Sequence, residues 1–226
     1  MKHKGFILIP LNSLLEKILL PMDLYKGQVC NYIMKEYVLQ TLFLKLTGCM
    51  EQKAKCILWD IATYDFEFRR EFLSDINPKQ GEYSTFDSKN TVYKILVSQV
   101  GRIDEPQKRI LLNELKDFKD NLLEKSIIKE WLPRELRDLK IKDLFAINRW
   151  GEDSLFSSPL NDKIYRSLYD HRNRCAHNVL SYQGNMMSPS KIKKMGEYDY
   201  ASWLTLLVLM DKIYIFLYKQ FTLKCC

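Results

Sequence analysis

Apolar residues recur at the spacing of an α-helix along most of this chain, and glycine and proline seldom interrupt them. The clearest stretch runs from Tyr25 to Thr47, where Val29, Ile33 and Tyr37 fall on one helical face. Eight glycines and seven prolines in 226 residues are few for the many tight turns of an all-β chain. The sequence therefore predicts an all-α fold, built as an antiparallel helical bundle.

The first half of the chain is expected to contain a helical hairpin. The segment 51–74 repeats the pattern of 25–47, and Gly48 stands between the two as a C-terminal helix stop. A polar loop is expected over 75–90, because this stretch contains Asn-Pro, a glycine and several hydroxyl side chains. The helical pattern then resumes over 91–100.

The second half is predicted to be helical with more interruptions. Asp104 followed by Gln107 is a helix start signal, and we expect that helix to run to about Lys129 before Pro133. Further elements are expected as one or two short helices over 134–150, a helix from 160 that leads into Arg172, and a last helix over 198–221, with loops over 151–159 and 181–197. We expect one domain spanning 1–226, with its core over about 160–222.

One tract, Ala201 to Tyr218, is apolar enough to raise the question of a membrane span. Asp211 and Lys212 interrupt it near its middle, which makes burial in lipid costly, so we expect a core helix and no membrane partner. Six cysteines without paired CxxC spacing predict reduced thiols. The first nine residues lack the core and cleavage site of a signal peptide, so we expect a cytoplasmic protein.

Two of the three histidines, His171 and His177, bracket the segment Arg172-Asn173-Arg174-Cys175. Histidine can take and give a proton near neutral pH, while arginine supplies a permanent charge and a fork of donors suited to phosphate oxygens. Phosphodiester cleavage needs both kinds of group. The formal net charge of +7 would also suit a phosphate-bearing partner, although ordinary protein surfaces carry similar charge.

The order Arg172-Asn173-x-x-Ala176-His177, placed between an amphipathic helix and a polar loop with a final apolar helix, resembles the HEPN superfamily. The resemblance covers 160–221 in detail and the first half only as generic helices. It implies an antiparallel bundle of HEPN type with additional N-terminal and middle helices, a homodimer with two motifs at a shared cleft, and metal-free RNA cleavage. Val179 occupies the position where one toxin-antitoxin branch carries a modified tyrosine, so the resemblance does not extend to that branch.

The resemblance implies an endoribonuclease without metal or other cofactor, acting in antiviral defence or as a toxin. Arg172 and His177 would be catalytic, Asn173 would support them, and Arg174 would bind RNA. The loop lysines Lys191, Lys193 and Lys194 are further candidates for RNA contact, although such lysines are often only solvated charge. Attack of the 2′-OH would leave a 2′,3′-cyclic phosphate. The expected partners are RNA, a second copy of the chain, and an inhibitor or activating protein.

Helix geometry sets a condition on this site. On an unbroken helix, Arg172 and His177 would point about 140° apart, whereas Asn173 and His177 would share a face. Convergence therefore requires a helix end, a kink or a second chain.

Several alternatives stay open at this point. Arg172 and Arg174 could cap helix carbonyls, and His177 could be a polar residue of the bundle. His171 is expected to be structural, and a zinc site with Cys175 lacks a fourth ligand in the sequence nearby. The whole chain could be a non-catalytic dimeric module of HEPN type that binds RNA, a nucleotide or a protein, or a helical scaffold in which the motif is coincidence.

Overall fold

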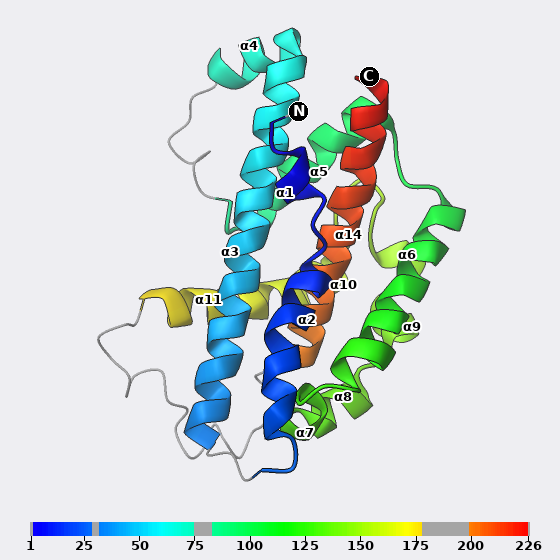
Figure 1. Ribbon diagram of the computed structural model, residues 1–226. Helices are drawn as coiled ribbons and strands as arrows, with labels where there is room; N and C mark the ends of the chain where they lie inside the picture. Colours follow the sequence, from blue (N-terminus) through cyan, green and yellow to red (C-terminus); the bar gives the residue numbers. More distant parts are fainter. Residues whose placement is uncertain (1, 29–31, 75–82, 178–198, 226) are drawn as a thin grey trace.

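The computed structural model describes residues 2–28, 32–74, 83–177 and 199–225, and over these residues the fold is all-α as predicted (Figure 1). Within that part of the chain the only β feature is an isolated bridge between Trp150 and Phe156. The helices are α1 (Lys4–Ile7), α2 (Leu11–Met22), α3 (Tyr32–Tyr64), α4 (Phe66–Ser74), α5 (Phe86–Val100), α6 (Glu105–Asp117), α7 (Ile128–Trp131), α8 (Pro133–Asp138), α9 (Ile141–Leu144), α10 (Ser158–Leu160), α11 (Arg166–His177) and α14 (Tyr200–Lys224). Short 3-10 segments η1 (Asp23–Tyr25) and η4 (Ile147–Arg149), and π-helical segments η3 (Phe118–Leu123) and η5 (Asn161–Tyr165), connect some of them.

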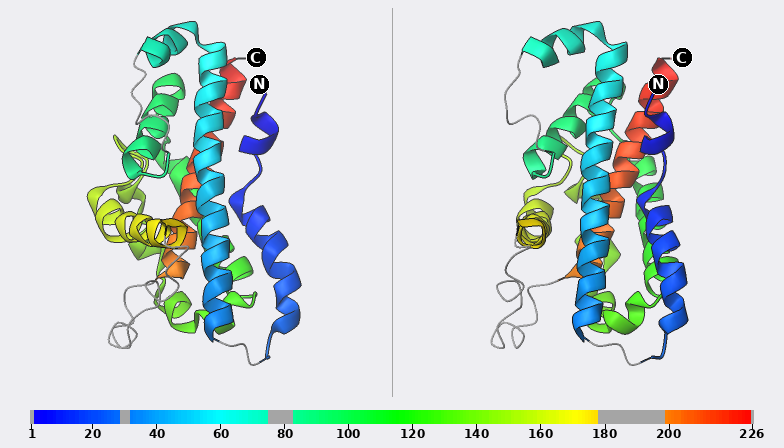
Figure 2. Two further views of the ribbon diagram at one scale, coloured as in Figure 1. Left: turned by 90° about the vertical axis from the view of Figure 1, so that its left-hand side faces the viewer. Right: turned by 60° about the vertical axis from the view of Figure 1, so that its left-hand side comes forward.

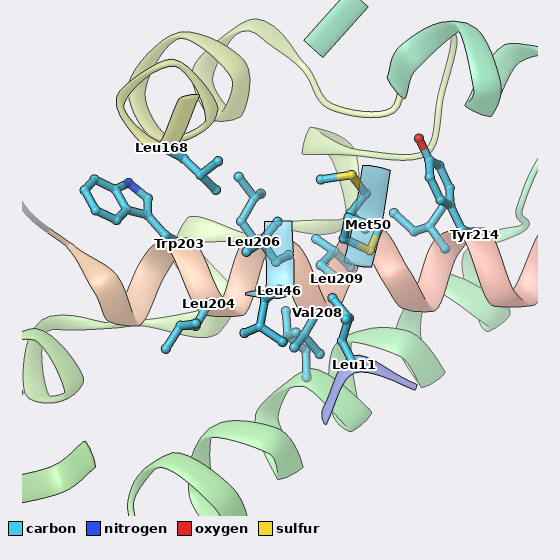
Figure 3. Packing of buried hydrophobic residues seen from close by; sticks show 14 of the residues in the cluster. Leu11, Leu46, Met50, Leu168, Trp203, Leu204, Leu206, Val208, Leu209 and Tyr214 are labelled. Atoms are coloured by element: carbon cyan, nitrogen blue, oxygen red, sulfur yellow. The ribbon is translucent and has the colours of Figure 1, made fainter. Parts of the chain in front are cut away.

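The last helix, α14, runs through the middle of the molecule. Figure 3 shows Leu46 and Met50 of α3 and Leu168 of α11 next to the labelled side chains of α14, and all of these residues belong to one buried cluster. The length and composition of α14 would also suit a membrane span, but 89% of its most apolar window is buried inside the protein. A helix that is apolar all round requires such an environment, and here the neighbouring helices provide it.

The expected hairpin around Gly48 is wrong, because 32–64 forms one continuous helix, α3. Gly48 lies inside it with an ordinary helical backbone, so it does not end the helix. A mid-helix glycine costs roughly 1 kcal/mol relative to alanine, which is less than the gain from burying one large apolar side chain. Leu46 and Met50, on either side of Gly48, are each at most 1% exposed. The packing of these neighbours therefore outweighs the low helix propensity of Gly48.

This continuity leads to a stability prediction. A Cβ added at Gly48 would meet nothing within 4 Å, so Gly48→Ala is expected to raise the free energy of unfolding by about 0.5–1 kcal/mol. The matched control is Gly101→Ala, which should destabilise the protein because Gly101 has a φ of +93° at the end of α5. Urea denaturation of both variants is the measurement. A loss of stability in Gly48→Ala would contradict a continuous α3.

Other predicted boundaries need correction or are confirmed. Helix α5 begins at Phe86 rather than at Thr91, because the Thr85 hydroxyl accepts a hydrogen bond from the Ser88 N–H and starts the helix earlier. The Asp104 start signal is confirmed, with its carboxylate accepting from the Gln107 N–H at 2.8 Å. That helix does not reach Lys129. It ends at Asp117 and continues as η3, and the following turn is held by Asp23 of η1, which accepts from the Ile127 N–H at 2.8 Å.

A buried ion pair joins the N-terminal segment to the two central helices. Asp211 of α14 accepts from the Lys53 ammonium of α3 at 2.5 Å and from the Leu11 N–H at 2.7 Å. The same ammonium also donates to the Ile9 carbonyl. Lys53 and Asp211 are at most 1% exposed. The charge that interrupts the apolar tract of α14 is thus satisfied inside the protein.

Candidate functional site

The candidate motif lies on α11, a helix that crosses α3. In Figure 1, α11 runs across the long axis of α3 near its middle, and in the right-hand view of Figure 2 it appears end-on beside α3. The preceding segment starts with Ser157 as N-cap and a proline in the first turn, and its Leu160 and Ile164 are buried as predicted. Leu168 continues this apolar face toward α14 (Figure 3). The motif is therefore attached to a firmly packed helix.

His171 points into the core and is only 2% exposed. Its ring stacks on Trp203 with centroids 4.8 Å apart and lies 5.2 Å from the Phe43 ring. Its Nε2 is 2.9 Å from the Tyr200 hydroxyl, which itself donates to the Glu36 carboxylate at 2.8 Å. Since the Tyr200 proton is used on Glu36, the His171 Nε2–H donates to the Tyr200 oxygen. This network agrees with the structural role expected for His171.

Burial keeps the His171 imidazole neutral. Desolvation, with a smaller contribution from the Arg174 charge, lowers the pKa of His171 to about 3. An imidazole with so low a pKa gives no proton to a substrate near neutral pH. Of the two histidines around the motif, only His177 thus remains a candidate for acid-base chemistry.

Arg172 points toward α3 and forms an ion pair that the sequence did not reveal. Its guanidinium lies 3.2 Å from a Glu51 carboxylate oxygen, with the arginine side chain 21% exposed and the glutamate 18%. It also donates to the Asn173 Oδ1 at 3.1 Å. The charge that was expected to bind phosphate is therefore partly balanced within the chain.

Helix α11 continues without interruption to His177. His177 is the last residue of the described range 83–177, and only its backbone is described. No break occurs between Arg172 and His177, so their positions are about 140° apart around one helix. The side chain of His177 lies outside the described part of the structure. Asn173 is on the same helical face as that position, but its Oδ1 is bonded to Arg172. A kink between Arg172 and His177 was one of the three ways in which these side chains could converge, and the continuous helix excludes it.

The structure describes only some of the remaining residues that were predicted for the site. Arg174 is exposed on α11, while Lys191, Lys193 and Lys194 lie outside the described residues. Cys175 Sγ is 3.5 Å from His171 Nε2, but burial, reinforced by the Glu36 charge, raises the pKa of the thiol to about 11. A metal ligand would need the thiolate, so this environment does not favour zinc. Across the described ranges, no group of three metal-ligating side chains gathers.

Comparison of the chain with family models, curated proteins and solved structures gave no match. The residues of α11 and the side chains around them are therefore the features that bear on function.

Proposed function

We propose that this chain is a metal-independent endoribonuclease of HEPN type that works as a symmetric dimer in the cytoplasm, in antiviral defence or as a toxin. The observation that carries the proposal is the placement of Arg172, Asn173 and His177 in the last turns of one packed helix. The inner face of α11 is buried, whereas Arg172 and Asn173 are partly accessible and Arg174 is exposed. A rigid support with accessible polar groups is the arrangement that positioned chemistry requires.

A single chain does not provide all the groups that this reaction requires. Attack by a ribose 2′-OH needs a base for its proton, an acid for the leaving 5′-oxygen, and positive charge on the phosphorane. Two His177 side chains could serve as base and acid, and two Arg172 guanidinium groups could supply the charge. Because α11 does not bend between these positions, a twofold dimer is the way to bring the histidine of one chain near the arginine of the other.

Glu51 makes this proposal specific. Its carboxylate orients the Arg172 guanidinium and balances its charge while RNA is absent. Phosphate oxygens match the guanidinium fork as well as a carboxylate does, so a bound phosphodiester would compete with Glu51 for the same donors. The pair would hold Arg172 in a defined position without making it inaccessible.

The direct test uses purified protein and a mixed-sequence RNA in excess chelator. His177→Ala is expected to reduce cleavage about a hundredfold, as is usual for loss of a general acid or base, and Arg172→Ala should behave similarly. Glu51→Gln is the matched comparison, because it removes the charge of the ion pair but keeps the arginine and a side-chain oxygen that can accept from it. It should therefore cleave far better than Arg172→Ala. Product ends should be 2′,3′-cyclic phosphate and 5′-hydroxyl. Intact RNA with the wild-type dimer, or equal cleavage by His177→Ala, would refute the proposal.

The Arg172–Glu51 pair also favours a second function, a non-catalytic module that binds RNA, a nucleotide or a protein. In that case Arg172 is a structural link between α11 and α3, and the two substitutions should have the same effect. Equal losses of stability in Arg172→Ala and Glu51→Gln, without RNA cleavage by any form, would support this alternative.

A further inference from the structure

Helix α3 has an exposed face on the side away from α14. Its buried residues Leu46 and Met50 lie next to α14, whereas Gly48, between them, is exposed, and a Cβ added to it would meet nothing within 4 Å. In the left-hand view of Figure 2, α3 stands between α11 and α2, so these two helices flank it. The outer face of α3 consists of exposed residues that recur at helical spacing, namely Tyr37, Lys45, Gly48, Gln52, Lys55 and Trp59.

The outer face is arranged symmetrically about its centre. Gly48 is the midpoint of α3, which runs from Tyr32 to Tyr64. The two aromatic residues of the face, Tyr37 and Trp59, are each eleven positions away from Gly48. Eleven positions make three helical turns with only about 20° left over, so these three residues lie almost on one line. A second α3, laid antiparallel across the first with glycine on glycine, would therefore place each tyrosine opposite the tryptophan of the other chain.

The residue types of the outer face suit contact with a second helix. Glycine at the crossing point lets two helix backbones approach closely, because it has no side chain. Tyr37 and Trp59 are 63% and 64% exposed, and such aromatic side chains are enriched at the energetic centres of protein interfaces. Opposed aromatic rings would remove apolar surface from water at both ends of the contact.

The charges of the outer face favour the antiparallel direction. Lys45 and Lys55 are both exposed. When α3 is reversed about Gly48, Lys45 falls opposite Glu51 of the second chain, and Lys55 falls opposite Thr41. In a parallel pair each lysine would instead face the same lysine of the second chain. Like charges placed opposite each other oppose association, so the parallel direction is disfavoured.

The antiparallel direction also brings the two motifs together. To reverse α3, a twofold axis must be perpendicular to it and run from the α2 side to the α11 side. Such an axis leaves α11 of both chains on the same side of the contact, whereas an axis parallel to α3 would put them on opposite sides. Arg172 is paired with Glu51, only three positions from Gly48, so the motif of each chain starts close to this axis.

We propose that the protein forms a twofold dimer through the outer face of α3, with Gly48 at the axis and a Tyr37–Trp59 pair on either side. The assignment of a shared cleft to this dimer rests on the proposed function, but the contact itself does not. Helix α3 is about 50 Å long, so a strip about 10 Å wide would bury about 1,000 Å² over both chains, the size at which specific interfaces begin. The two α11 helices would add to this area, because Figure 1 shows the end of α11 extending past α3 on the side away from α14.

The test measures the dimer by analytical ultracentrifugation in the absence of RNA. Gly48→Lys is expected to raise the dissociation constant of the dimer at least a hundredfold, because it places two long, charged side chains against each other at the axis. The chain itself should still fold, since lysine is a better helix former than glycine and the space around Gly48 is open. Ile110→Lys replaces an exposed apolar side chain of α6 and is the matched control, which should stay dimeric. Gly48→Ala adds only a methyl group and should stay dimeric as well.

A charge swap tests the direction of the two helices independently. Tyr37→Glu and Trp59→Lys are each expected to weaken the dimer at least tenfold. The double variant Tyr37→Glu/Trp59→Lys should associate more tightly than either single variant, because each new glutamate faces a new lysine of the second chain. A parallel dimer would place the new charges against their own copies. A monomeric wild type, a dimer that Gly48→Lys leaves intact, or a double variant weaker than both single variants would overturn the proposal.

Cleavage assays on the same samples distinguish this interface from the proposed nuclease. If Gly48→Lys separates the chains but the wild-type dimer leaves RNA intact, the interface is supported and the nuclease proposal fails. If His177→Ala abolishes cleavage while no α3 variant changes the dimer, the nuclease is supported and the interface is wrong. With both proposals correct, Gly48→Lys should cut RNA at least tenfold more slowly at concentrations where the wild type is dimeric. Undiminished cleavage by separated Gly48→Lys chains would overturn the assignment of the shared cleft to this interface.

Discussion

Asp211→Ala is expected to lower the free energy of unfolding by about 3–5 kcal/mol, the usual loss when one partner of a buried ion pair is removed. The Lys53 ammonium would remain in the core with only the Ile9 carbonyl as a partner, and the Leu11 N–H would lose its acceptor. Both side chains are almost fully buried, so water cannot compensate easily. Chemical denaturation monitored by circular dichroism measures the change.

Two controls separate this effect from a general sensitivity to charge removal. The double variant Lys53→Met/Asp211→Leu removes both charges and keeps the volume, and it should recover most of the lost stability. Arg109→Gln breaks an exposed pair with Glu105, both more than two-thirds exposed, and should change stability little. A loss below about 1 kcal/mol in Asp211→Ala would show that the pair does not hold the core together as described.

Acidification from pH 7 to pH 4 is expected to cost the folded state about 3 kcal/mol through His171 alone. The folded pKa of His171 is about 3, below its ordinary value of 6.5, because burial disfavours the imidazolium. The unfolded chain therefore binds this proton below pH 6.5, while the folded chain does so only near pH 3. Stability from this group is present above pH 6.5 and is lost as the pH falls toward 3.

The measurement is urea denaturation of wild type and His171→Phe at several pH values between 4 and 7. Other groups also titrate in this window. Glu135 has the opposite sign, since its pKa of about 7 in the folded state favours folding as the pH falls toward 4.5. Subtracting the two pH profiles removes such shared contributions. Phenylalanine keeps an aromatic ring beside Trp203 and cannot be protonated, so its profile should lack the acid loss. Parallel profiles would show that His171 is not neutral in the fold.

The class of fold could be predicted because it depends on periodicity, which each segment carries in itself. The last helix was predicted over 198–221 and is observed at Tyr200–Lys224, since nothing competes with an apolar tract of that length. The hairpin at Gly48 was not predictable in the same way. Whether a glycine ends a helix depends on what its neighbours bury, and the partners of Leu46 and Met50 come from distant parts of the chain.

The candidate site shows the same division. The segment Arg172–His177 could be found from its residue types, but Glu51 and Tyr200 could not, because each bonds a residue of α11 across more than twenty residues of sequence. Glu36 is one step further away, since it bonds Tyr200. A prediction of one continuous helix over 32–64 would have related two of these residues to each other. Glu36 and Glu51 are fifteen positions apart, which places them within about 60° of each other on a continuous helix. The mistaken hairpin put them on separate helices.

The contact between Leu11 and Asp211 also affects how the chain folds as it is made. These residues are 200 positions apart, so the carboxylate that holds the N-terminal segment is synthesised long after that segment leaves the ribosome. At about 5–20 residues per second, the delay is on the order of 10–40 s. During this time α2 lacks the helix against which its leucines are buried, and Lys53 lacks its counter-ion. The segment around α2 is therefore made long before it becomes stable, and it is a part that chaperones would need to protect.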